Sequence, residues 1–298
     1  MRRAERVGYT MVELLIGLTL MSIVGGAVAA AVASQWRSHD ALADAERSRQ
    51  ALRDGANVLL GELRALSPAA GDLVSALDTA LEVRATLGAS VLCSLTVARD
   101  RLMLPPRQPT VGAALTWWRD GPVAGDSVDI IDGRGASPDT ISRHEVVDLA
   151  GGRCSLSSGF VRSAGDAWSS LQLTVSPPLP LSIGVGAPLR FLRRARYSLY
   201  RSSTDGRWYL GIKELLGGSW NGIQPVAGPF EAPTASGSGG MAITVRDTAG
   251  SPIGATPFGT ARAIEIDLRS RGTQPARALG RAVVVSESLH VTLAPRNE

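Results

Sequence analysis

The sequence predicts an α+β protein in which one long N-terminal helix packs on an antiparallel β-sheet head. Three observations predict this fold class. Residues 14–36 include no charged side chain. An apolar stripe at three- and four-residue steps then runs to Leu66, where Ser67-Pro68 ends the helical pattern. The remainder contains many of the chain's 33 glycines and 17 prolines between short runs of alternating polarity, as loop-rich β proteins do.

The first part of this helix is long enough to cross a bilayer, which takes about 20 apolar residues. Arg2, Arg3 and Arg6 precede it, so the positive-inside rule keeps the N-terminus in the cytoplasm and sends the rest across. Two ordinary interpretations fit. One is a transmembrane anchor, and the other is a signal peptide cleaved after the small residues at 27–29 or 31–33. Neither explains Glu13, because a carboxylate inside an apolar segment costs roughly 2.5–3.5 kcal/mol.

The run Gly8-Tyr9-Thr10-Met11-Val12-Glu13 resembles the type IV prepilin signature. That signature is a short basic leader ending in glycine, an aromatic residue, threonine, two apolar residues, glutamate and then a long apolar run. The resemblance implies that a prepilin peptidase removes leader 1–8 by cutting between Gly8 and Tyr9, and then methylates the new amino terminus of Tyr9. Two departures are mild: Tyr9 stands where phenylalanine is commoner, and Met11 where leucine is usual.

The same resemblance implies a role in assembly for Glu13. Cleavage leaves an α-amino group, with a reference pKa near 7.7–8.0, close to the membrane core. Moving a carboxylate or an ammonium out of water has a large free-energy cost, and this cost is smaller if the two groups form an ion pair. In the family, this glutamate is thought to neutralise the amine of a neighbouring subunit as the helices bundle. Glu13 is then an assembly residue and not a catalyst.

The helix continues beyond the membrane as an amphipathic spine. We expect four parts: leader 1–8, transmembrane and assembly helix 9–34, amphipathic continuation 35–67 and a β-rich extracytoplasmic head 68–298. The predicted buried stripe is Leu42, Ala45, Leu52, Ala56, Leu59, Leu63 and Leu66.

The sequence of the head predicts strands separated by turn residues. Predicted strands are 91–97, 127–131, 171–175, 189–200, 208–215, 241–245, 263–268 and 282–293. Thr204-Asp205-Gly206 predicts a hairpin between two of them. The Pro- and Gly-rich segments 176–188 and 234–240 are linkers or long loops, and the first is where the head could divide into two lobes.

A head of this size is large for a subunit repeated densely along a fibre. In the pilin family it resembles minor subunits, namely PilW-like minor pilins and the J-type pseudopilins of type II secretion. The order of features is similar: a helical ALRDGANVLLGELRAL, a cysteine-bearing strand, the hairpin YSLYRSSTDGRWYL and a long final strand.

Cys93 and Cys154 are the only cysteines. In an exported head an even number favours a disulfide, and a loop of this length would stabilise the fold by roughly 4 kcal/mol in the chain-entropy model. The alternative is two buried free thiols.

Motifs for catalysis, metals and nucleic acid are weak. His144-Glu145 begins like a zinc-binding helix, but the second histidine is missing, which favours a surface strand. Asp126, Asp129 and Asp132 lack the every-second-residue spacing of a calcium loop, which favours a solvated turn. Arg193-Arg194-Ala195-Arg196 could touch DNA or lipid but is typical of a solvated face, and the net charge of +4 is small. We therefore expect no enzyme activity, no metal and no cofactor, and nucleic acid as an unlikely partner.

The expected function is that of a minor pilin or pseudopilin that primes or caps a type IV pilus or a type II secretion pseudopilus. The expected partners are the prepilin peptidase, other pilins or pseudopilins, the inner-membrane assembly platform and the membrane. The expected location is the inner membrane, with the head in the periplasm. The alternative is a secreted or membrane-anchored β-rich enzyme or adhesin with an ordinary export signal.

Overall fold

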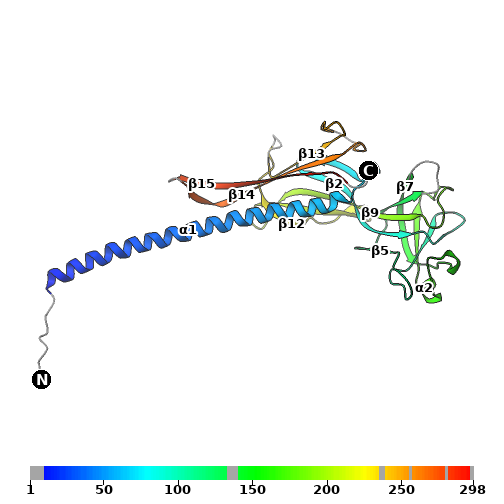
Figure 1. Cartoon of the computed structure of the whole chain (residues 1–298), viewed down its shortest axis with the longest axis horizontal. Coiled ribbons are helices and arrows are strands. Elements are labelled where there is room, and N and C mark those ends of the chain that lie inside the picture. Colours follow the sequence, from blue (N-terminus) through cyan, green and yellow to red (C-terminus); the bar gives the residue numbers. More distant parts are fainter. Residues whose placement is uncertain (1–9, 133–139, 235–238, 255–256, 279–280, 296–298) are drawn as a thin grey trace, which may run out of the picture. The chain divides into compact units, whose positions relative to one another are not determined.

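The structure, a computed structural model, describes residues 10–132, 140–234, 239–254, 257–278 and 281–295 (Figure 1). A long N-terminal helix followed by antiparallel strands confirms the α+β class, and the β part is larger than the head of a typical pilin. The elements are α1 (Met11–Arg64), β1 (Leu73–Leu77), β2 (Ala80–Val91), β3 (Ser94–Leu95), β4 (Arg101–Leu104), β5 (Trp117–Trp118), β6 (Ser127–Asp132), β7 (Thr140–Gly151), η1 (Leu156–Ser158), α2 (Ala164–Trp168), β8 (Leu171–Ser176), β9 (Pro188–Arg201), β10 (Trp208–Leu216), β11 (Ser219–Trp220), β12 (Gln224–Phe230), β13 (Met241–Arg246), β14 (Ala263–Ala278) and β15 (Arg281–Leu293).

The chain forms two compact units. The first comprises Met1–Gln50 with Arg271–Glu287, and the second comprises Ala51–Ser270 with Ser288–Glu298. Helix α1 and strands β14 and β15 contribute residues to both.

Helix α1 ends where the sequence predicts. Its last turn tightens through bonds from the Ala65 and Leu66 amides to carbonyls three residues back, at 3.2 and 3.3 Å. The next amide, of Ser67, donates to the buried carboxylate of Asp72 at 2.8 Å. Pro68 then prevents the helix from continuing.

The apolar stripe of α1 is confirmed in the second unit. Leu52, Ala56, Leu59 and Leu63 are buried in a core shared with strands β2, β9, β10, β13 and β14. Gly55 belongs to this face, because a β-carbon there would lie 2.9 Å from the ring of Phe230. The stripe was wrong at one position: Leu42 is 70% exposed, because the buried face is shifted by one residue to Ala41 at that level.

Strand β2 is paired with β9 in antiparallel fashion along the whole length of β2, from Ala80↔Ser198 to Val91↔Pro188. The larger sheet has the order β1-β2-β9-β6-β7-β8-β4-β3, with β10 on the C-terminal half of β9, β11 and β12 on β10, and β5 on β2. A separate three-stranded sheet has the order β13-β14-β15.

A second core lies at the other end of the β2–β9 pair. Strands β4, β6, β7 and β8 contribute to it, with Phe191 and Trp118 in edge-to-face contact at 5.8 Å. The segment 176–188 is a loop, as predicted, and it supplies Leu179 and Ile183 to this core. The Arg99 guanidinium holds the loop by donating to the carbonyls of Leu179, Pro180 and Ile183.

Most predicted strands are present, and 204–206 is the turn between the paired strands β9 and β10. The strand predicted at 91–97 is wrong: β2 ends at Val91 and only Ser94–Leu95 follows. The sequence analysis also missed β1, most of β2, β4, β5, β11 and β12, predicted β7 only as a surface strand around His144, and ended β14 ten residues early.

Candidate functional site

Helix α1 begins with a capping box formed by Thr10 and Glu13. The backbone N–H and the hydroxyl of Thr10 donate to Glu13 Oε2 at 3.0 and 3.1 Å, and the Glu13 N–H donates to the Thr10 hydroxyl oxygen at 3.3 Å. These bonds satisfy donors at the helix N-terminus that have no partner within the helix. The carboxylate also lies at the positive end of the helix dipole.

This cap was missed in the sequence analysis, although its signal is present there. Thr10-Met11-Val12-Glu13 has the Ser/Thr-x-x-Glu spacing that marks a helix start before an apolar run. Within one chain, Glu13 therefore already has a structural role. Any role between chains must be separated from it experimentally.

The apolar part of α1 is uncovered. Every residue from Thr10 to Asp40 is exposed, and α1 is the one helix in the described residues that is long and apolar enough to cross a membrane, with a mean hydropathy of 2.2 over an 18-residue window. Its few hydroxyls bond within the helix. Thr19 donates to the carbonyls of Leu15 and Ile16, and Ser22 to that of Thr19, at 2.8–3.0 Å. These bonds lower the cost of placing the hydroxyls in lipid. The expected cleavage and methylation residues, Gly8 and Tyr9, lie outside the described residues.

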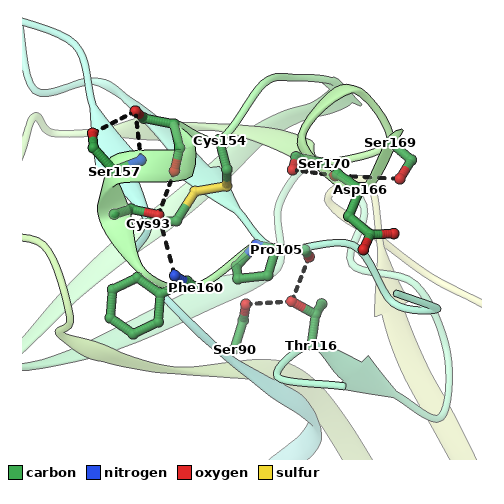
Figure 2. The surroundings of a disulfide bond; sticks show 12 residues. Ser90, Cys93, Pro105, Thr116, Cys154, Ser157, Phe160, Asp166, Ser169 and Ser170 are labelled. Carbon is green, nitrogen blue, oxygen red and sulfur yellow. Dashed lines mark hydrogen bonds between the residues drawn. A yellow bond between two sulfur atoms is a disulfide. The ribbon is translucent and has the colours of Figure 1, made fainter. Parts of the chain in front are cut away.

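Cys93 and Cys154 form a disulfide, as expected (Figure 2). It links the chain just after β2 to the connection between β7 and β8, with 5.8 Å between the α-carbons. Both cysteines are buried and form a third small core with Val161 and Ala167. The disulfide therefore holds the β7–β8 connection, with η1 and α2, against the sheet.

Asp166 anchors a second loop beside the disulfide. It accepts from the Thr110 amide at 2.7 Å, from the Thr110 hydroxyl and from the Val111 amide. These hydrogen bonds, that from the Thr110 amide first, outweigh desolvation and hold the pKa of Asp166 below its ordinary value. The side chain thus acts as an ionised anchor for the 105–116 loop. Figure 2 shows it with Ser169 and Ser170, whose hydroxyls donate to its backbone carbonyl at 3.3 and 3.0 Å.

A hollow of about 460 Å³ adjoins the disulfide. Its walls include Cys154, Leu156 and Trp168, and its one charged lining residue is Arg153, whose guanidinium lies 4.1 Å from the Trp168 ring. No nucleophile paired with a base lines it.

The expectation of a surface strand around His144 is half right. The residue lies on β7, but its side chain is buried. Its ring nitrogens make hydrogen bonds with the Ser142 hydroxyl at 2.7 Å and the Pro177 carbonyl at 2.6 Å. His144 is therefore fixed in the fold by neighbours on two sides.

The aspartates at 126, 129 and 132 were expected in a solvated turn, and this is wrong. All three are buried. Asp126 accepts two bonds from Arg193, at 2.9 and 2.8 Å, and Arg193 is itself only 1% exposed. The expectation of a solvated face at 193–196 is therefore right only in part: Arg193 is a core residue, whereas Arg194 is partly exposed and Arg196 is exposed.

A second ion cluster, of two buried carboxylates and two partly exposed arginines, joins four parts of the chain. Arg143 on β7 pairs with Asp129 on β6 and with Asp72, which follows α1, at 2.6 and 2.9 Å. Arg190 on β9 pairs with the same two carboxylates at 3.0 and 2.8 Å. The loop after the spine helix is thereby fixed to the large sheet.

In the described ranges, no group of three or more His, Cys, Asp and Glu side chains could hold a metal ion. The comparisons found no matching family model, no similar curated protein and no similar solved structure.

Proposed function

We propose that the chain is a minor pilin or pseudopilin, an envelope-spanning subunit that primes or caps a type IV pilus or a type II secretion pseudopilus. The observation that carries this proposal is the apolar helix that opens at Thr10 and Glu13 and stays uncovered for about 30 residues. The signature around Gly8 adds support. A lone anchor needs neither the carboxylate nor the uninterrupted passage of the helix into the head.

In this proposal, leader removal after Gly8 creates an amino terminus at Tyr9, one turn before Glu13. The carboxylate of one subunit then pairs with the amine of a neighbour. Pairing offsets the desolvation cost of both the carboxylate and the amine. A subunit without a neighbour would leave one of these charges buried without a counter-ion. The helix surfaces supply packing, and the ion pair fixes the axial register.

The capping box allows this role to be tested separately from helix capping. Glutamine serves as well as glutamate at the third helical position of a capping box, but it carries no charge. We therefore expect Glu13→Gln and Glu13→Ala to reduce co-purification with partner pilins by the same large factor, since losing one member of a buried pair costs about 3–5 kcal/mol. Glu13→Asp should do better than either, and membrane insertion should be unharmed in all three.

Thr10→Ala is the matched control. It removes the cap and keeps the charge, so assembly should persist, with a loss of only about 1 kcal/mol in helix stability. The opposite pattern, in which Glu13→Gln assembles like the wild type and Thr10→Ala does not, would show that Glu13 acts as a cap only.

A further inference from the structure

The hollow beside the disulfide carries a positive charge without a counter-ion in the described part of the chain. Arg153 is exposed, and its guanidinium lies 4.1 Å from the centre of the Trp168 ring. This contact uses none of the five N–H donors of the guanidinium. The described residues supply no acceptor for these donors, and every other residue that lines the hollow is uncharged. The hollow therefore favours a ligand with an anionic group.

The backbone that carries Arg153 is held on both sides. On one side, a β-carbon on Gly152 would lie 2.7 Å from the Gln172 amide nitrogen, so glycine lets the chain pass close to β8. On the other side, the Cys154 amide donates to the Ala167 carbonyl at 3.3 Å, and the Cys154 side chain is bridged (Figure 2). The charge is thus attached to a fixed backbone before a ligand binds, which lowers the entropy cost of binding.

The largest walls of the hollow are apolar and open to solvent. Trp168 is 66% exposed and Leu156 is 53% exposed. Sites for small molecules bury roughly 70–90% of the ligand surface, and walls that remain more than half exposed enclose too little of a small acid for that. They can hold the terminal residue of a longer chain that continues outside the hollow.

We propose that this hollow binds the C-terminal residue of a peptide chain, with the terminal carboxylate on Arg153 and an apolar side chain against Leu156 and Trp168. A guanidinium suits a carboxylate because it donates two parallel hydrogen bonds to the two oxygens. The polar side chains of the lining, apart from Arg153, are the hydroxyls of Ser94 and Ser155. An acidic sugar is therefore disfavoured, since each of its many hydroxyls needs a partner when it leaves water. The proposal does not rest on leader cleavage, membrane insertion or fibre assembly.

The test uses the full chain in detergent micelles and a tetrapeptide that ends in phenylalanine and carries a fluorophore on its amino end. Fluorescence anisotropy measures binding of the peptide with a free C-terminal carboxylate and of the same peptide with a C-terminal amide. We expect saturable binding of the free acid, and binding of the amide that is weaker by about tenfold or more, because a hydrogen-bonded charge is lost. N-acetylphenylalanine should compete only at much higher concentration; competition at the same concentration as the peptide would overturn the choice of a peptide.

Arg153→Gln should bind the acid as weakly as the amide, and Trp168→Ala should weaken the binding of both. Arg162→Gln is the matched control, since it removes an exposed arginine from the same β7–β8 connection outside the lining and should keep the preference for the acid. Unchanged mobility on non-reducing gels checks that each variant keeps its disulfide. Three results would each overturn the proposal: no saturable binding to the wild type, equal binding of acid and amide, or Arg153→Gln binding like Arg162→Gln.

Discussion

At the scale of residues, Arg193 meets two carboxylates that differ in burial. Asp126 is 1% exposed and binds the guanidinium with both oxygens, whereas Asp120 is 64% exposed and reaches it from the surface at 2.5 Å. Burial alone would lower the pKa of Arg193, but the hydrogen bonds and charges of Asp126 and Asp120 raise it above its ordinary value. The arginine thus stays charged inside the protein, and this charge depends chiefly on Asp126.

We expect Asp126→Asn to destabilise the head by about 3 kcal/mol, because it leaves a buried cation without its counter-ion. Asp120→Asn should cost no more than about 1 kcal/mol, since exposed ion pairs contribute little. Thermal unfolding of the two variants measures this difference: the melting temperature of Asp126→Asn should fall by about 6–12 °C. Equal shifts would mean that the buried pair is not what holds Arg193.

At the scale of elements, the disulfide links the β7–β8 connection to the chain after β2. Among the described residues, the third core has four buried members, two of which are the cysteines, and the partly buried Met103 and Phe160 pack against it. The bridge closes a loop with a sequence separation of 61. In the chain-entropy model, such a loop stabilises the fold by about 4 kcal/mol.

Cys93→Ser should therefore lower the melting temperature, and the double variant with Cys154→Ser should fall by a similar amount, because one substitution already opens the loop. On non-reducing gels, the wild type should run ahead of both variants, and reduction should remove the difference. A wild-type band whose mobility does not change on reduction would show that Cys93 and Cys154 are free thiols.

The elements also show which features the sequence could reveal. The limits of α1 were predictable because charge-free composition, the apolar stripe and Ser67-Pro68 are all local signals. Strand β7 was predicted only as a surface strand around His144, because its outward side is charged and its buried side is carried partly by that histidine. The burial of Asp126 was equally hidden, since its partner Arg193 is 67 residues away and nothing near Asp126 announces it.

The same limit applies to the extension of β14 beyond the predicted strand. The predicted strand 263–268 has clean alternation, but the stretch after it holds Gly272 and Pro275, which normally argue against a strand. Its extended form is supported by contacts with α1 that no local pattern encodes. At the start of α1 the signal was local but was not used. The Thr10–Glu13 capping box could be recognised from the sequence, whereas Glu13 was predicted only to pair with a neighbouring subunit.

At the scale of the whole molecule, the proposed function depends on a single event at residues 8 and 9. If the chain is an assembled subunit, the leader is removed after Gly8 and the new terminus at Tyr9 is methylated. If it is a simple anchor or a signal peptide, the mature terminus lies elsewhere. The rest of the fold, with its buried ion pairs and its disulfide, is compatible with an assembled subunit, a simple anchor or a cleaved signal peptide.

The most direct measurement is the N-terminal sequence and intact mass of the protein extracted from membranes of cells with an active prepilin peptidase. We expect a chain that begins at Tyr9 and carries one added methyl group, whereas Gly8→Trp should retain residues 1–8 and still insert. A wild-type chain that begins near Ala30 or Ser34, or that keeps Met1 beside the active peptidase, would contradict the proposed function.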